Sequence, residues 1–189
     1  SVYICIYYHD CLRELMNYFK YVFPILKNSI GGLTFHIYNI EILEDGIDKG
    51  YIKNITQAEL KEFILDKEWC NVYRNIPHSE IVKRKYNYKF HFYLYEKVEM
   101  CHLIASDIRH SISIGCIPIM YKNIARIFGE FRFIIYTGES LSPRTLIDFC
   151  KRAINYPQDN LDTLKKYNQS QLHEYSKENW VENFIKLLV

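Results

Sequence analysis

The chain contains few of the residues that interrupt regular structure. Seven glycines and five prolines among 189 residues form no rich cluster that would act as a flexible linker, and the sequence holds no internal repeat. Apolar residues make up 49% of the chain and charged residues 24%, a balance typical of globular proteins with a buried core. We therefore predict one domain that spans residues 1–189.

An excess of either charge is also missing, and so is any long apolar run. The formal net charge is +2 at pH 7, so composition gives no general reason to expect a nucleic-acid or anionic-membrane partner. The opening stretch SVYICIYYHD is too short to span a membrane and lacks the basic leader of a signal peptide. We expect a cytoplasmic protein without a transmembrane segment.

Motifs of metal, thiol and serine chemistry are absent as well. The six cysteines include no C-x-x-C pair, which favours reduced thiols. His102 and His110 lie eight positions apart, but a helix cap expected at Ser106 separates them and no third ligand has suitable spacing. The sequence also lacks the G-x-S-x-G elbow of serine hydrolases. We therefore expect no metal site.

The sequence does contain a regular alternation of strand-like and helix-like segments. Runs of β-branched and aromatic residues predict strands at 2–8, 33–40, 70–76, 88–95, 117–120 and 131–137. Apolar periodicity and capping residues predict helices after Asp10, at 56–67, from 77 to 85, from about 107, at 142–154 and in two further stretches, whereas 46–50 is expected to be a polar loop. This alternation predicts an α/β fold, a Rossmann-like three-layer domain with a mainly parallel sheet.

Residues 106–120, SDIRHSISIGCIPIM, combine a helix with a glycine and a proline-containing strand. Ser106 or Asp107 is expected to cap the helix, so that its first N–H groups face the mouth of the sheet and bind a phosphate. Arg109 would add a charge-assisted hydrogen bond to the same group. Gly115 ends the helix by permitting a left-handed turn. The alternative interpretation is an ordinary corner between a helix and a strand.

A second segment, residues 82–97, interleaves basic and aromatic residues as VKRKYNYKFHFYLYEK. This pattern is typical of binding to single-stranded nucleic acid. Tyr86, Tyr88, Phe90 and Phe92 alternate, however, as the buried face of a central strand would. Buried rings cannot stack on bases, so we expect no nucleic-acid partner.

The stretch IRHSISIGCIPI, residues 108–119, resembles the segment R-E-S-x-x-x-G-C-I-P-I in the C-terminal, nucleotide-sugar-binding domain of GT-B-fold glycosyltransferases. Other stretches are similar to that domain in the same order, namely residues 1–26, 33–39, 72–81, 88–97 and 175–188. The resemblance implies the donor half of a hexosyltransferase-type glycosyltransferase. Its substrate would be a UDP- or GDP-linked sugar, with no bound cofactor and no catalytic metal.

The resemblance also implies site residues. Two glutamates that the family carries eight positions apart correspond to His102 and His110, where an imidazole would have to bind hydroxyl groups. The family's diphosphate-binding lysine corresponds to about Asp10, and Arg13 is the nearest basic residue. The implied site comprises His102 and Arg109 as catalytic residues, with Arg13, Asn75, Ile76, Ser106, Asp107, His110 and Ser111 as donor ligands.

The acceptor-binding half of a GT-B enzyme has no counterpart in these residues. The resemblance therefore implies a further domain or subunit that binds an acceptor, whether glycan, protein or lipid. The missing acids and the missing lysine also support a different hypothesis: a degenerate, non-catalytic glycosyltransferase-like domain used for binding or assembly.

Overall fold

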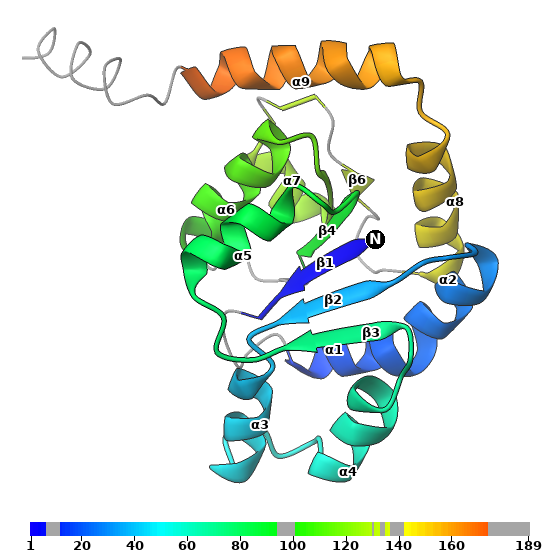
Figure 1. Ribbon diagram of the computed structural model, residues 1–189, viewed down its shortest axis with the longest axis vertical. Coiled ribbons are helices and arrows are strands. Elements are labelled where there is room, and N and C mark those ends of the chain that lie inside the picture. Colours follow the sequence, from blue (N-terminus) through cyan, green and yellow to red (C-terminus); the bar gives the residue numbers. More distant parts are fainter. Residues whose placement is uncertain (7–11, 94–100, 130, 133–134, 137–141, 174–189) are drawn as a thin grey trace, which may run out of the picture.

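A computed structural model of the chain describes residues 1–6, 12–93, 101–129, 131–132, 135–136 and 142–173. Six parallel strands form one sheet in the order β3-β2-β1-β4-β5-β6 (Figure 1). The strands are β1 (Val2–Cys5), β2 (Phe35–Tyr38), β3 (Cys70–Tyr73), β4 (Phe90–Tyr93), β5 (Ile117–Met120) and β6 (Ile135–Tyr136). This is the Rossmann strand order, so the predicted Rossmann-like α/β fold with a parallel sheet is confirmed.

Helices connect the strands and cover both faces of the sheet. The first connection contains α1 (Leu12–Asn17), the π-helix η2 (Tyr18–Val22) and α2 (Phe23–Ser29); the second contains α3 (Glu41–Asp48), α4 (Gln57–Leu60) and the π-helix η3 (Lys61–Leu65). The later ones are α5 (His78–Lys85), α6 (Cys101–Ser113), α7 (Lys122–Ile127), α8 (Pro143–Ile154) and α9 (Gln158–His173). Figure 1 shows α1 and α2 behind the sheet, and α5 and α6 in front of it.

The back of the sheet is an apolar core. Residues alternate along each strand, and the parallel register places Val2 beside both Phe35 and Phe90 on this face. The Phe23 ring of α2 lies 4.5 Å from the Phe35 ring and 5.2 Å from the Phe92 ring, measured between centroids. All of these side chains are buried. The first helical connection is therefore held to the sheet by aromatic packing.

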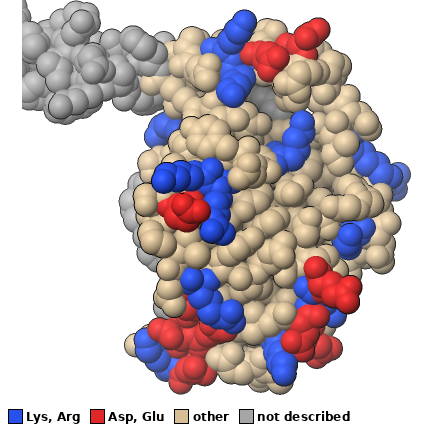
Figure 2. Space-filling model, in the orientation of Figure 1, with Lys and Arg blue, Asp and Glu red and all other residues tan. Residues whose placement is uncertain are grey.

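Tyrosine and histidine dominate the front of the sheet. Tyr3 and His91 are neighbours in the register of β1 and β4, and their rings meet edge to face at 4.2 Å. Tyr38 and Tyr73 stack at 4.6 Å on β2 and β3. Figure 2 shows this side of the molecule, where charged side chains surround a largely uncharged centre.

Several predicted helix ends are confirmed. Ser142 caps α8 by accepting a hydrogen bond from the Thr145 amide at 3.2 Å, and Pro143 occupies the first helical position. Thr56 caps α4 and forms a reciprocal capping box with Glu59. Gly115 adopts a φ of +78° directly after α6, the left-handed conformation that glycine permits. These helix ends could be predicted because each depends on the type of residue at the end itself.

Two other predictions are wrong. The polar loop expected at 46–50 is largely helix, since α3 continues to Asp48; Leu43 and Ile47, one turn apart, hold it against the core. Tyr86 and Tyr88 do not continue the buried face of β4, which begins at Phe90. Tyr86 follows α5 and is 66% exposed. The structure confirms the buried face only for Phe90 and Phe92.

Candidate functional site

The strand order reverses between β1 and β4. In open parallel sheets, ligands bind beyond the carboxyl ends of the strands at this reversal, because the two connections diverge there and leave a crevice. β1 ends at Cys5 and β4 at Tyr93, and the segments 7–11 and 94–100 that follow lie outside the described residues. The described part of this edge includes the turns after β2 and β3 and the backbone at the starts of α1 and α6.

The turns after β2 and β3 each contain an asparagine in a left-handed conformation. Asn39 has a φ of 61° and Asn75 a φ of 52°, values that asparagine tolerates better than most residues. The Asn39 amide donates to the carbonyl oxygen of Ile6 at 3.1 Å, which ties the end of β2 to the chain after β1. The Asn75 backbone amide donates to Glu41 Oε1 at 3.2 Å. Both turns are therefore fixed at the carboxyl edge of the sheet.

The helix N-terminus expected at Ser106 is not there. α6 is already helical at Cys101, so Ser106 is its sixth residue. Beyond the first four residues of a helix, each N–H bonds to the carbonyl one turn earlier. The amides of Ser106 to Arg109 are therefore occupied within the helix and do not face a phosphate. The buried side chains of Ile108 and Ile112 hold this part of the helix against the core.

Asp107 forms a buried ion pair instead of a helix cap. Its carboxylate pairs with the ammonium group of Lys85, which lies in the last turn of α5. Both side chains are almost completely buried, and the Lys85 ammonium also lies 5.2 Å from the centroid of the Tyr3 ring. Burial lowers the pKa of Lys85 to about 8. The ion pair joins α5 to α6 over the front of β1.

A hydrogen-bonded network extends this ion pair onto β4. His91 Nδ1 lies 2.8 Å from Ser111 Oγ, and the Tyr93 hydroxyl donates to Ser111 Oγ at 2.8 Å. The Tyr93 hydroxyl also lies 3.0 Å from the Asp107 carbonyl oxygen, and His91 Nε2 lies 3.7 Å from Asp107 Oδ2. Burial and the nearby Lys85 ammonium keep the pKa of His91 well below its usual range, so the imidazole is neutral.

The order Asp107, His91, Ser111 has the residue types of a nucleophilic triad. Ser111 is 0% exposed and His91 is 1% exposed, so a substrate cannot reach the serine oxygen in this structure. Its two neighbours, His91 and Tyr93, already occupy that oxygen. The network therefore acts as structural support between α6 and the sheet.

Arg109 and His110 lie close to residues that follow the C-terminal ends of two neighbouring helices, α7 and α5. The Arg109 guanidinium lies 5.5 Å from the centroid of the Phe128 ring, directly after α7. The His110 ring lies 6.0 Å from the Tyr86 ring, directly after α5, and burial lowers the pKa of His110. Arg109 is about 10 Å from His102 along the α6 axis. These residues therefore lie away from the start of α6.

The structure thus divides the nine predicted site residues into two groups. Arg13 at the start of α1, Asn75 and Ile76 after β3, and His102 at the start of α6 belong to the carboxyl edge. The side chains of Arg13 and His102 lie outside the description, whereas Ile76 is partly buried against the aromatic cluster of Tyr3 and Tyr38. Ser106, Asp107, Arg109, His110 and Ser111 belong to the body of α6.

Sequence reasoning missed the residues that complete the buried network. Lys85 is the last residue of the helix predicted from 77 to 85, and it is 2% exposed. His91 and Tyr93 alternate with Phe90 and Phe92, so they lie on the opposite face of β4. A histidine and a tyrosine in alternation on a central strand are the signal that predicts a polar layer there.

The described residues hold no group of three or more His, Cys, Asp or Glu placed to bind a metal ion. Cys5, Cys70, Cys116 and Cys150 are buried thiols. Burial raises the pKa of Cys116 to about 12, so this thiol stays protonated. In the part of the chain with described coordinates, no helix has both the length and the apolar character that crossing a bilayer requires.

Comparison with known proteins adds no relative. No protein-family model matches the chain, and no curated protein shows significant sequence similarity to it. Function must therefore be inferred from the fold, the edge of the sheet and the residues themselves.

Proposed function

We propose that the chain binds a nucleotide-sugar in the crevice between β1 and β4 and forms the donor half of a GT-B-type glycosyltransferase. The observation that carries this proposal is the strand order β3-β2-β1-β4-β5-β6, which reverses between β1 and β4. This reversal creates the ligand position of Rossmann-like sheets. The resemblance of residues 108–119 to the donor domain of these enzymes supports the choice of ligand.

The carboxyl-edge residues take the proposed roles. Arg13 follows β1 and would stabilise the negative charge that grows on the departing diphosphate. Asn75 and Ile76 follow β3 and would lie near the base, and His102 at the start of α6 would bind a sugar hydroxyl. The acceptor hydroxyl, supplied by a further domain or subunit, would attack the anomeric carbon as the nucleoside diphosphate leaves.

In this proposal the residues in the body of α6 do not contact the donor. Asp107 is paired with Lys85, the Ser111 hydroxyl is hydrogen-bonded to His91 and Tyr93, and Arg109 lies beside Phe128. A donor would have to break this packing to reach them. In the proposal these residues hold α6 in place, and the start of the helix contacts the donor.

A second candidate is a non-catalytic domain that binds a nucleotide or assembles with a partner. Its supporting observation is that Asp107, a predicted donor ligand directly before the segment that resembles the transferases, is already paired with Lys85 in a buried ion pair. His102 and His110 occupy the positions of the family's two acids. We place either version in the cytoplasm, where the four buried thiols would remain reduced.

Thermal unfolding in the presence of UDP, GDP and their hexose derivatives tests the proposal. A ligand at about 100 times its Kd stabilises the folded state by about 2.7 kcal/mol, so the Tm should rise by several degrees. Arg13→Ala should reduce the shift, whereas the matched control Arg109→Ala should retain it. The absence of any shift with all nucleotides would contradict donor binding, and binding without transfer to any acceptor would favour the non-catalytic domain.

A further inference from the structure

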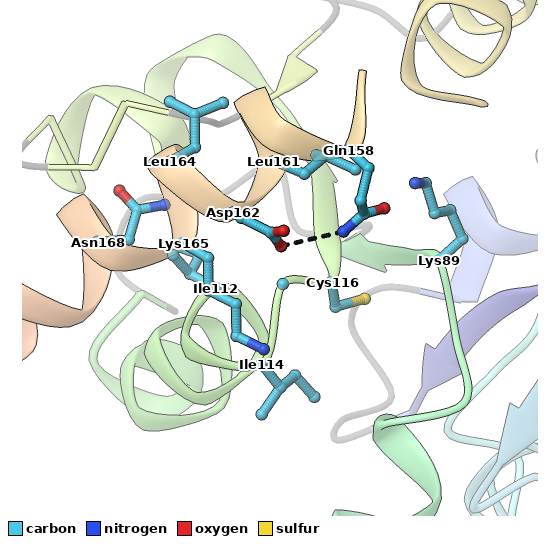
Figure 3. Close-up of a pocket in the computed structure, with 11 residues that line it drawn as sticks. Lys89, Ile112, Ile114, Cys116, Gln158, Leu161, Asp162, Leu164, Lys165 and Asn168 are labelled. Carbon is cyan, nitrogen blue, oxygen red and sulfur yellow. Dashed lines mark hydrogen bonds between the residues drawn. The ribbon is translucent and has the colours of Figure 1, made fainter. Parts of the chain in front are cut away.

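The two edges of the sheet differ in whether their carboxylates have hydrogen-bond partners. A pocket of about 180 Å³ lies at the amino ends of β4 and β5, and Asp162 is the carboxylate that lines it (Figure 3). Asp162 accepts a hydrogen bond from Gln158 Nε2 at 3.0 Å. The side chains of Lys89 and Lys165 end on opposite sides of it. The polar groups described in this pocket therefore do not converge on one point.

Glu41, at the carboxyl edge, has an oxygen without a partner. It is the first residue of α3 and lies three positions after the end of β2 (Figure 1). Its Oε1 atom accepts a hydrogen bond from the Asn75 backbone amide at 3.2 Å. Its Oε2 atom is buried and forms no hydrogen bond to any residue that the structure describes. Because a buried polar atom without a partner costs free energy, such an atom points to a group that binds there.

The surrounding contacts hold the Glu41 carboxylate in a fixed position. Glu44, three residues later on α3, accepts hydrogen bonds from Arg74 Nε at 3.0 Å and from Arg74 Nη2 at 2.6 Å. Together with the bond from Asn75 to Glu41, these contacts join α3 to the turn after β3. Asn39 ties the chain after β2 to the chain after β1. A carboxylate that is already positioned loses little freedom when a ligand binds.

The other acidic side chains of α3 already have partners. Each of the three forms at least one hydrogen bond to a basic or amide side chain, namely Glu44 to Arg74, Asp45 to Lys49 and Asp48 to Gln57. Glu41 therefore differs from its neighbours, because only its Oε1 atom is used and only by a backbone amide.

The place of Glu41 along the sheet corresponds to the ribose of the proposed donor. In the order β3-β2-β1-β4, the end of β2 lies between the end of β3, where we place the base, and the ends of β1 and β4, where we place the diphosphate and the sugar. Adjacent strands lie about 4.8 Å apart, so the groups that follow them would meet successive parts of one ligand. In a nucleotide-sugar, the ribose stands between the base and the diphosphate, and its hydroxyl groups donate hydrogen bonds.

We propose that Glu41 Oε2 accepts a hydrogen bond from a ribose hydroxyl of the nucleotide donor. This inference rests on the proposed function, since it assigns one part of that ligand. Glu41 as a whole is only partly buried, and side-chain rotations that would uncover its Oε2 atom are common on binding. The negative charge repels a diphosphate, which favours a donor whose nucleoside end lies over β2 and β3.

Isothermal titration with UDP and GDP, each beside its 2′-deoxy and 3′-deoxy analogues, tests this role. In wild type, we expect one analogue to bind about tenfold or more weakly than its parent, the scale of a hydrogen bond to a charged group. Glu41→Gln keeps an oxygen for the Asn75 amide but replaces the second oxygen by an NH₂ group, so the ratio of the two affinities should fall toward one. Glu44→Gln is the matched control, because it alters the same turn from the same helix and should leave the ratio unchanged.

This ratio separates ribose recognition from damage to the fold, because a loosened turn weakens the binding of parent and analogues alike. Equal affinities of the parent and both analogues in wild type would overturn the role of Glu41 and leave nucleotide binding intact. The same ratio in wild type and Glu41→Gln would overturn it as well. If no nucleotide bound at all, the proposed function would fail, and the inference with it.

Discussion

The two faces of the central sheet come from alternate residues of the same strands, yet they are stabilised by different chemistry. The back face joins Phe35 and Phe92 to α2 through ring packing. On the front face, Lys85 of α5 lies over the Tyr3 ring and forms an ion pair with Asp107 of α6. His91 is hydrogen-bonded to Ser111 of α6. An apolar face loses stability in proportion to the volume removed, whereas a buried polar face depends on whether each partner remains satisfied.

The back face should show the largest loss on truncation. Phe35→Ala removes a fully buried ring that contacts Phe23, Trp69 and Phe92. We expect it to lower the free energy of unfolding by about 3–5 kcal/mol, measured by urea denaturation. Tyr86→Ala, which truncates an exposed ring, should change it by less than about 0.5 kcal/mol. Equal effects would contradict the assignment of the core.

The front face should respond to the loss of one partner and recover when both are replaced. Asp107→Ala leaves the buried Lys85 ammonium without its carboxylate, and we expect it to destabilise the protein by about 3 kcal/mol. The double variant Lys85→Met with Asp107→Leu should regain most of that loss, because no charge then remains buried. Additive losses in the double variant would show that the ion pair is not coupled as described.

Acid should weaken the front face selectively. Burial keeps the pKa of His91 well below 6.5 in the folded state, so as the pH falls below 6.5 the unfolded state binds a proton before the folded state does. Stability should therefore fall as the pH falls below 6.5. His91→Gln should flatten the dependence measured by denaturation at each pH, whereas the exposed His78→Gln should not. An unchanged slope in His91→Gln would show that His91 is not a buried neutral group.

The corner between α6 and β5 should give the smallest effect. Gly115→Ala places a side chain at a φ of +78°, although the nearest atom, Lys165 Cδ, would be an acceptable 3.6 Å away. The cost is therefore one of backbone conformation, about 1 kcal/mol. Gly31→Ala, at a glycine without positive φ and with open space around it, should cost less. Thermal unfolding of the two variants compares them directly.

The sequence predicted the apolar features of the fold correctly but not the buried polar contacts. Apolar alternation in Phe90 and Phe92 identified a buried strand, and Ser142 with Pro143 identified a helix start, because each signal is local. The predicted start of α6 at Ser106 was wrong, because the helix begins at Cys101. Asp107, which was expected to cap the helix, pairs instead with Lys85, 22 residues earlier. The sequence shows that both residues are charged, but only the fold brings them together and removes them from solvent.

The candidate site was predicted less well than the fold for the same reason. Asn75, Ile76, Arg13 and His102 lie at the expected edge because they follow strands directly or begin helices. Arg109, His110 and Ser111 were grouped with them because the resemblance treats residues 108–119 as one binding motif, yet a helix carries successive residues about 1.5 Å further along its axis and around all its sides. A linear motif within a helix therefore does not define one surface.

The most direct test of the account is a titration of the isotope-labelled chain with UDP- and GDP-hexoses, followed by backbone amide chemical shifts. We predict that the perturbed amides cluster at Asn39, Asn75 and the start of α6, while those of Arg109 to Ser111 remain unchanged. Perturbations centred on Arg109 to Ser111, or none with any nucleotide-sugar, would contradict a donor site at the reversal between β1 and β4.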